Sequence, residues 1–127
     1  MSENKSEIGT IGWIDLTVDD ASGIRDFYSS VVGWSFEEHS MGDYNDYVMK
    51  SENNLPVAGI CHKIGFNSNL PSKWLIYITV KNLDQSLDRV INYGGKIIDE
   101  IKNYTDMGKY CVIEDPAGAV LVLFEKY

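Results

Sequence analysis

Apolar and polar residues alternate near the start of the chain, and this pattern predicts a strand over residues 11–18. Ile14, Leu16 and Val18 share one face of this strand, and the opposite face is more polar. From residue 21 the apolar spacing changes to that of a helix, which predicts a helix over residues 21–32. Its apolar stripe consists of Ile24, Phe27, Tyr28 and Val31. A strand and a helix that each carry one apolar face are expected to pack together.

Local signals mark both ends of this helix. Asp20 can cap its first turn, because a carboxylate accepts a hydrogen bond from a free backbone N–H there. Gly33 can end it in the left-handed conformation. Short alternating runs then predict strands over residues 34–38, 47–50 and 57–63. Residues of about 9–64 are therefore predicted to form a βαβββ module.

The second half of the chain repeats the pattern of the first. At an offset of 62 or 63 residues, Ile14–Asp20 aligns with Ile76–Asn82, and Tyr47–Ala58 aligns with Tyr110–Leu121. Residues 65–72 between the two copies contain loop formers without periodicity and are predicted to be a linker. An internal repeat of this length indicates two copies of one supersecondary unit.

In the second copy, starting at about residue 73, the pattern predicts a strand over residues 74–80 and a helix over residues 83–93. Asn82 caps this helix, and its buried stripe is predicted to be Leu83, Leu87, Val90 and Ile91. Further strands are predicted at residues 96–101, 109–114 and 119–125, with a turn at 115–118. The predicted fold class is α+β, with two tandem βαβββ modules in a single domain of residues 1–127.

Each module leaves one sheet face without a helix. That face carries Trp13, Asp15 and Thr17 in the first module and Leu75, Tyr77 and Thr79 in the second. A mixture of aromatic and hydrogen-bonding groups is typical of a ligand cleft. The same mixture also fits polar groups buried for structural reasons, or a surface that packs against a second subunit.

Composition limits the partners of the chain. Eleven basic residues against 19 acidic ones give a net charge of about −8, which repels phosphate backbones and anionic lipid surfaces. No apolar run is long enough to cross a membrane, and the polar residues 1–10 lack the apolar core of a secretory signal. Cys61 and Cys111 lie far apart without metal-ligand spacing and are expected to be reduced packing residues. The chain is therefore expected to be cytoplasmic, without nucleic acid or membrane partners.

The ordered set of short motifs across both copies is specific. It comprises Val18–Asp20, Phe27–Tyr28, Gly33–Trp34, Trp74–Val80 and Asp115–Gly118. Together they resemble the vicinal oxygen chelate superfamily, which includes glyoxalase I, bleomycin resistance proteins and extradiol dioxygenases. The branch of predicted enzymes related to lactoylglutathione lyase is the most similar. The resemblance implies a sheet-lined cup around a small molecule and, in many members, a homodimer.

The resemblance also implies a divalent metal, held by His and Glu, in the enzymes of the superfamily. The corresponding strand positions in this chain are Trp13, Gly59, Leu75 and Val122. None of them offers a metal-binding donor atom. Asp15 lies on the same strand face as Trp13, but His62 has the opposite parity from Gly59, and two ligands are too few for a tight site. We therefore expect neither a metal nor another cofactor.

Asp15 is the most informative single residue, because a carboxylate among apolar neighbours needs a donor or a cation. It is predicted either to act on a ligand or to satisfy a structural hydrogen bond. The predicted ligand-binding residues are Trp13, Asp15, Thr17, Leu75, Tyr77, Thr79, Val122 and Phe124. Tyr44, Tyr104 and Met107 are placed in loops at the rim.

These observations favour a metal-free small-molecule binding protein, closer in site chemistry to the bleomycin resistance type than to glyoxalase I. One alternative is a lyase, isomerase or oxygenase with a non-standard metal or acid-base site. Another is a structural or regulatory module whose cup is filled by its own side chains. No residue is assigned a catalytic role, and the identity of the ligand stays open.

Overall fold

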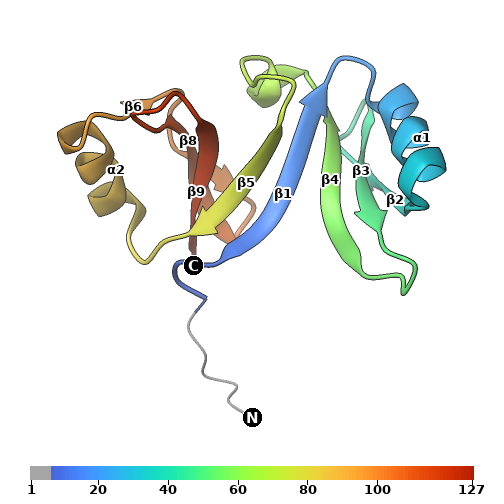
Figure 1. The fold of residues 1–127 in the computed structure, drawn as a ribbon, viewed down its shortest axis with the longest axis horizontal. Coiled ribbons are helices and arrows are strands. Elements are labelled where there is room, and N and C mark those ends of the chain that lie inside the picture. The colour runs from blue at the N-terminus through green and yellow to red at the C-terminus, as the bar shows by residue number, and fades with distance from the viewer. Residues whose placement is uncertain (1–6) are drawn as a thin grey trace, which may run out of the picture. The chain divides into compact units, whose positions relative to one another are not determined.

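The computed structural model describes residues 7–127, which form two compact units. The N-terminal unit is Trp13–Trp74, and the C-terminal unit consists of Leu75–Tyr127 together with the described residues up to Gly12. Each unit pairs one helix with a small sheet, which confirms the predicted α+β class and its repeat (Figure 1). The first module contains β1 (Ile11–Val18), α1 (Ala21–Val32), β2 (Ser35–Ser40), β3 (Asn45–Lys50) and β4 (Pro56–His62). The second contains β5 (Trp74–Thr79), α2 (Leu83–Asn92), β6 (Lys96–Ile97), β7 (Lys102–Tyr104), β8 (Gly108–Glu114) and β9 (Val120–Lys126).

In the N-terminal unit the strand order is β2-β3-β4-β1, and only the β1–β4 pair is parallel. Helix α1 lies against one face of this sheet. The core beneath it is built from Ala21, Tyr47, Met49 and Ile60, all of them buried. A short 3-10 turn, η1 (Gly65–Asn67), forms inside the segment predicted to be an irregular linker.

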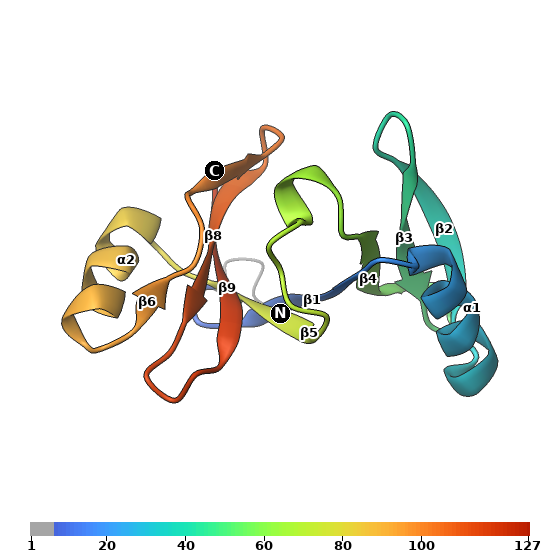
Figure 2. The ribbon, with the colours of Figure 1, turned by 90° about the horizontal axis from the view of Figure 1, so that it is seen from above.

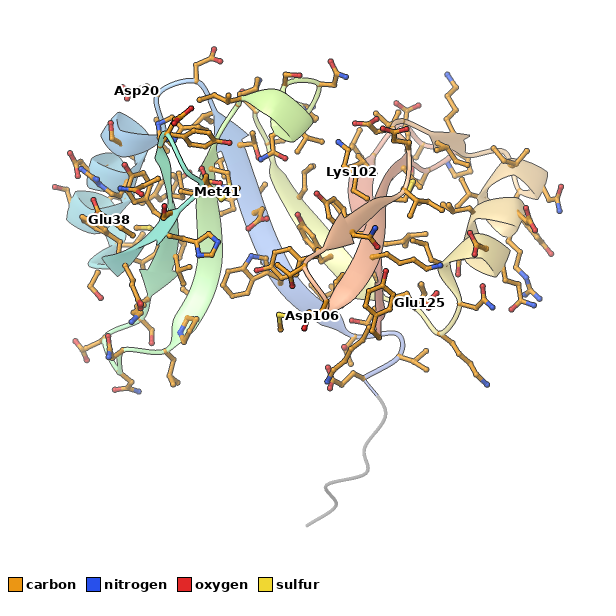
Figure 3. All side chains as sticks on the ribbon, turned by 180° about the vertical axis from the view of Figure 1, so that it is seen from behind. Asp20, Glu38, Met41, Lys102, Asp106 and Glu125 are labelled. Atoms are coloured by element: carbon orange, nitrogen blue, oxygen red, sulfur yellow. The ribbon has the colours of Figure 1, made fainter. Side chains whose placement is uncertain are left out.

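The predicted ends of α1 are confirmed. The side chain of Asp20, labelled in Figure 3, accepts a hydrogen bond from the backbone N–H of Gly23 at 3.0 Å. Gly33 ends the helix with a φ of 80°. The predicted stripe is partly wrong, because Phe27 and Val31 are exposed. Each residue turns the helix by about 100°, so the face centred on Ala21, Ile24 and Tyr28 leaves Phe27 and Val31 on its flank.

In the C-terminal unit, β5 pairs with β9 in parallel, and β8 pairs with β9 in the antiparallel sense. Helix α2 covers one face (Figure 2). The core beneath it consists of Leu83, Leu87, Cys111, Ile113 and Leu123. Val90 packs at its margin as predicted, whereas the predicted burial of Ile91 is wrong, because that side chain is 55% exposed.

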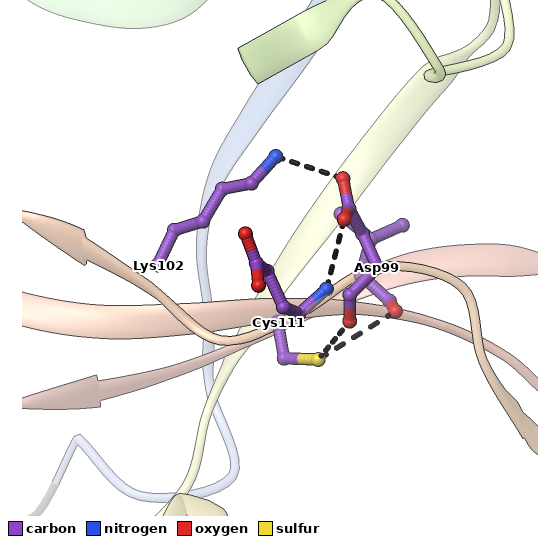
Figure 4. A network of polar contacts seen from close by, with 5 residues as sticks. Asp99, Lys102 and Cys111 are labelled. Atoms are coloured by element: carbon purple, nitrogen blue, oxygen red, sulfur yellow. Dashed lines mark hydrogen bonds and ion pairs between the residues drawn. The ribbon is translucent and has the colours of Figure 1, made fainter.

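The prediction of a single strand over residues 96–101 is wrong, because this edge of the C-terminal sheet consists of two short strands, β6 and β7. Both pair with β8, but Ile97 lies opposite Ile113 whereas Lys102 lies opposite Tyr110, so the edge contains extra residues around Asp99. The Cys111 thiol donates to the Asp99 carbonyl at 3.1 Å, and Lys102 Nζ lies 2.8 Å from Asp99 Oδ2 (Figure 4). The first of these contacts joins two different strands and the second is local, and together they hold the bulge that interrupts the sheet edge.

The N-terminus of α2 has two side-chain acceptors. Asn82 accepts from the backbone N–H of Gln85 at 3.0 Å, as its predicted capping role requires. Glu125, at the end of β9, accepts from the backbone N–H of Leu83 at 2.7 Å and so ties the helix to the sheet. The negative carboxylate also complements the positive end of the helix dipole.

Replacing Glu125 with Ala should therefore lower the free energy of unfolding by about 1 kcal/mol, the usual effect of removing a helix cap. Thermal and urea unfolding would measure the loss. The neighbouring Lys126→Ala is the matched control, because the Lys126 side chain makes an exposed ion pair with Glu7 and its loss should change stability by less than about 0.5 kcal/mol. Equal effects of the two substitutions would contradict the capping role.

Among residues 7–127, neither helix is long and apolar enough to span a bilayer. The prediction about residues 1–10 falls partly outside the described residues.

Candidate functional site

The sheet face opposite α1 is the candidate site in the N-terminal unit. Gly59 of β4 lies directly opposite Asp15 of β1 and Val48 of β3, and directly opposed residues project from the same face of a sheet. The next row, in which Ile60 lies opposite Leu16 and Tyr47, points toward α1. Parity therefore places Trp13, Asp15 and Thr17 together on the face without a helix, as predicted.

Asp15, Trp13 and Gly59 form a close polar cluster on this face. The indole Nε1–H of Trp13 donates to Asp15 Oδ1 at 2.5 Å. Gly59 has no side chain, and a Cβ built there would overlap Asp15 Oδ1 and lie 3.4 Å from Trp13 Nε1. The Asp15 carboxylate thus fills the space that a side chain at residue 59 would occupy.

A second carboxylate, Asp46 of β3, is buried near the end of the same sheet and was not singled out from the sequence. Its Oδ1 accepts from the backbone N–H of His62 at 2.9 Å and lies 3.6 Å from His62 Nδ1. The His62 ring contacts the rings of Tyr44 and Tyr47. By register His62 has the parity of Ile60, opposite to that of Gly59 as predicted, although its Nδ1 lies beside Asp46, which has the parity of Val48.

The thiol of Cys61 is affected by both carboxylates. Burial raises the pKa of Cys61 far above its ordinary range, and the charges of Asp15 and Asp46 raise it further. Burial likewise raises the pKa of Cys111. Thiolate, rather than thiol, is the reactive form, so these shifts disfavour reactivity of both thiols, and Cys111 packs in the core under α2 as predicted.

The corresponding face of the C-terminal unit is more apolar. Tyr77 lies opposite Val122, and Thr79 lies opposite Phe124, so these four residues share the face away from α2. Leu75 and Val122 are buried, with 3% and 1% exposed. The predicted residues of this module therefore share one face, but the two residues at family ligand positions are buried hydrocarbon.

Two aromatic side chains on this face lie beside identifiable neighbours: Tyr77 beside the Tyr110 ring and Phe124 beside Gly108. The Tyr77 ring lies 6.3 Å from the Tyr110 ring. Gly108 accommodates the ring of Phe124, because a Cβ at Gly108 would lie 2.5 Å from Phe124 Cζ. Among the predicted rim residues, Tyr104 and Met107 are exposed at the β7–β8 turn, and Tyr44 contacts His62.

The residues at the family positions do not fit a divalent metal. Trp13 offers an indole N–H, which only donates, and Gly59, Leu75 and Val122 offer no side-chain donor atom at all. Across residues 7–127 no three His, Cys, Asp or Glu side chains converge as a metal site would require.

Two features of this site escaped prediction from the sequence. Gly59 was identified only as a position without a ligand, whereas its missing side chain is what admits Asp15. Asp46 shares the strand parity of Val48, so a carboxylate in an otherwise alternating strand was the available signal. The places of Gly59 and Asp46 in the site depend on which strands pair and in which register. The residues next to them in the sequence do not determine this pairing.

Comparison with known proteins gives consistent matches over most of the chain. Residues 10–123 match the family model described as Glyoxalase/Bleomycin resistance protein/Dioxygenase superfamily. A protein of Mycobacterium tuberculosis, provisionally named glyoxylase CFP32, is 32% identical over 119 residues, which cover 92% of this chain and 46% of that protein. The chain therefore spans about half the length of the curated relatives it matches.

Solved structures agree on the fold. A superfamily member from Vibrio splendidus has a TM-score of 0.61 at 15% identity, covering 90% of this chain and 97% of that one. A methylmalonyl-CoA epimerase variant from Streptomyces coelicolor, in complex with 2-nitronate-propionyl-CoA, has a TM-score of 0.60 at 10% identity, covering 94% and 98%. At these identities the likeness shows the fold alone.

Proposed function

The chain belongs to the Glyoxalase/Bleomycin resistance protein/Dioxygenase superfamily, and within it we propose that this chain binds a small organic molecule without a metal. One observation carries the proposal. Gly59, at a position where the resemblance implies a metal ligand, has no side chain, and the Asp15 carboxylate occupies the space that a side chain would fill. The Trp13 indole N–H donates a hydrogen bond to this carboxylate. An anionic hydrogen-bonding group beside an aromatic ring suits an organic ligand.

The other predicted residues support the same function. Thr17 lies on the Asp15 face, and Leu75, Tyr77, Thr79, Val122 and Phe124 share the corresponding face of the C-terminal unit. We propose that these residues form the ligand-binding face of their own unit. The epimerase with the same fold was solved with a small-molecule ligand, which is consistent with this use of the fold.

Protein purified without an affinity tag should carry no stoichiometric zinc, nickel, manganese or iron, because the family positions lack donor atoms. Elemental analysis by mass spectrometry checks the metal content, and thermal unfolding with and without each added metal checks for weak binding. Near-equimolar metal that survives dialysis and raises the melting temperature would contradict the metal-free assignment.

Binding itself is testable by a thermal-shift screen of small aromatic amines, alcohols and acids, followed by titration of the hits. The proposal expects hits that perturb the NMR signals of Trp13 and Thr17. A screen whose hits leave the signals of both sheet faces unchanged would contradict it.

We also propose that the chain acts as a homodimer in the cytoplasm. The curated relatives are about twice as long, so a second copy would supply an equal length of chain. Both cysteines are free, which suits a reducing compartment. Light scattering should then give about twice the chain mass of 14.3 kDa, and a monomer mass at micromolar concentration would contradict the dimer.

A further inference from the structure

The outward side of α1 consists of uncharged residues, and two of them are large apolar side chains. Helical spacing brings four residues together on this side, away from the core: Gly23, Phe27, Ser30 and Val31. Phe27 and Val31 are 54% and 61% exposed. These four residues are called the outer α1 face below.

The second copy of the repeat shows that the fold does not require such a face. At the 62-residue offset of the repeat, polar residues of α2 take the positions of Gly23, Phe27 and Ser30: Gln85, Arg89 and Asn92. All three are exposed, as is usual for the solvent side of a helix. Phe27 stands where its counterpart is a charged residue, so the fold does not account for an aromatic ring at this exposed position.

Phe27 is the outermost ring of an aromatic cluster in the N-terminal unit. Its ring meets the Tyr28 ring edge-on, with 5.1 Å between the centroids, and Tyr28 packs against Trp34 and Trp74. The Trp74 indole also donates to the Tyr28 hydroxyl at 3.1 Å. A ring that is already supported in this way loses little conformational freedom on binding, which is the property of an aromatic anchor in a protein interface.

We propose that the outer α1 face is the surface through which two copies of this chain form a dimer, with the two α1 helices packed against each other about a twofold axis. The inference rests on the proposed homodimer and names its contact surface. In such an interface the same face serves both copies, so the Phe27 side chain of each copy packs on the outer α1 face of the other.

Charge favours a second copy as the occupant of this face. Each chain carries a net charge of about −8, and the repulsion between two such chains is smallest where the facing surfaces are uncharged. The outer α1 face meets this condition, because Asp26, the acidic residue of the helix, is paired with Arg25 at 2.9 Å. A partner of equal size is also consistent with the curated relatives, of which this chain covers about half.

Phe27→Arg gives α1 the residue that α2 has at the same position of the repeat, and it places two like charges in the interface. The dissociation constant of the dimer should rise at least about 30-fold, the effect of losing a central interface residue. Light scattering over a concentration series measures this constant, and circular dichroism of the same samples checks the fold. Ile91→Arg is the matched control, because Ile91 of α2 is also 55% exposed but lies outside the outer α1 face, and it should leave the dimer unchanged.

A cross-linking experiment tests the same surface without a disruptive substitution. Ser30→Cys and Asn92→Cys each add one thiol at equivalent exposed positions of α1 and α2. A short bismaleimide should convert the first variant into a covalent dimer and leave the second monomeric under denaturing electrophoresis. The native thiols should contribute little, because burial raises the pKa of both Cys61 and Cys111.

The outcomes distinguish the surface from the dimer itself. A dimer that folded Phe27→Arg leaves intact, or that cross-links equally well through Asn92→Cys, would overturn the outer α1 face and leave the proposed homodimer in place. Equal weakening by Phe27→Arg and Ile91→Arg would also overturn the face. Wild-type protein that stays monomeric throughout the concentration series would overturn both the dimer and this surface as a contact between copies.

Discussion

Gly108→Ala is expected to lower the free energy of unfolding by about 3 kcal/mol, at the upper end of the usual cost of overpacking. A Cβ at Gly108 would lie 2.5 Å from the backbone carbonyl oxygen of Glu125 and 2.5 Å from Phe124 Cζ. The Phe124 ring can rotate, but the carbonyl belongs to the β8–β9 ladder, where Gly108 lies opposite Lys126. The two strands must therefore separate, and the melting temperature should fall by roughly 10 °C.

A second substitution distinguishes the two sources of overlap. Phe124→Ala removes the ring but leaves the Glu125 carbonyl, so it should not rescue Gly108→Ala. Gly12→Ala, in the same unit, should be nearly silent because its Cβ meets only Thr79 Oγ1 at 3.6 Å. Rescue by Phe124→Ala would show that the ring, rather than the backbone, sets the requirement for glycine. For Gly59→Ala the opposite result, rescue by Asp15→Ala, is expected, because there a side chain is the obstacle.

Local chemistry explains why the helices were predictable. Asp20, Asn82 and Gly33 act within one turn of the helix ends they mark, so their roles follow from sequence spacing alone. The apolar spacing gave the helix lengths within a residue. It misassigned Phe27 and Ile91, because the width of the buried face is set by the sheet beneath the helix and not by the helix itself.

Contacts between distant residues explain what the sequence left undetermined. The break between β6 and β7 depends on the Cys111 thiol bonding to the Asp99 carbonyl, a contact between different strands. Strand parity placed Asp15 on the correct face, but the fit of its carboxylate over Gly59 required the parallel register of β1 and β4. A site made across strands is fixed only once the strand pairing is known.

Replacing Asp15 with Asn should weaken binding of a cationic ligand by about 1.5–3 kcal/mol, the scale of a charge-assisted hydrogen bond. The fold should survive, because the Asn side-chain oxygen can still accept from Trp13 Nε1–H and fits the same space over Gly59. Titration with benzylammonium should therefore show roughly a 10- to 150-fold weaker affinity. The melting temperature should change by less than about 2 °C.

The opposite result would give Asp15 a structural role. If the carboxylate chiefly satisfies the Trp13 indole within the sheet, losing its charge weakens that short bond and lowers the melting temperature, while the affinity for benzylammonium stays unchanged. Asp15→Ala extends the comparison, because it leaves the half-buried indole N–H without this acceptor and should destabilise by about 1–3 kcal/mol under either role. Only Asp15→Asn removes the charge and keeps a hydrogen-bond acceptor. A loss of affinity with little loss of stability would show that Asp15 binds ligand, and a loss of stability with unchanged affinity would show that it stabilises the sheet.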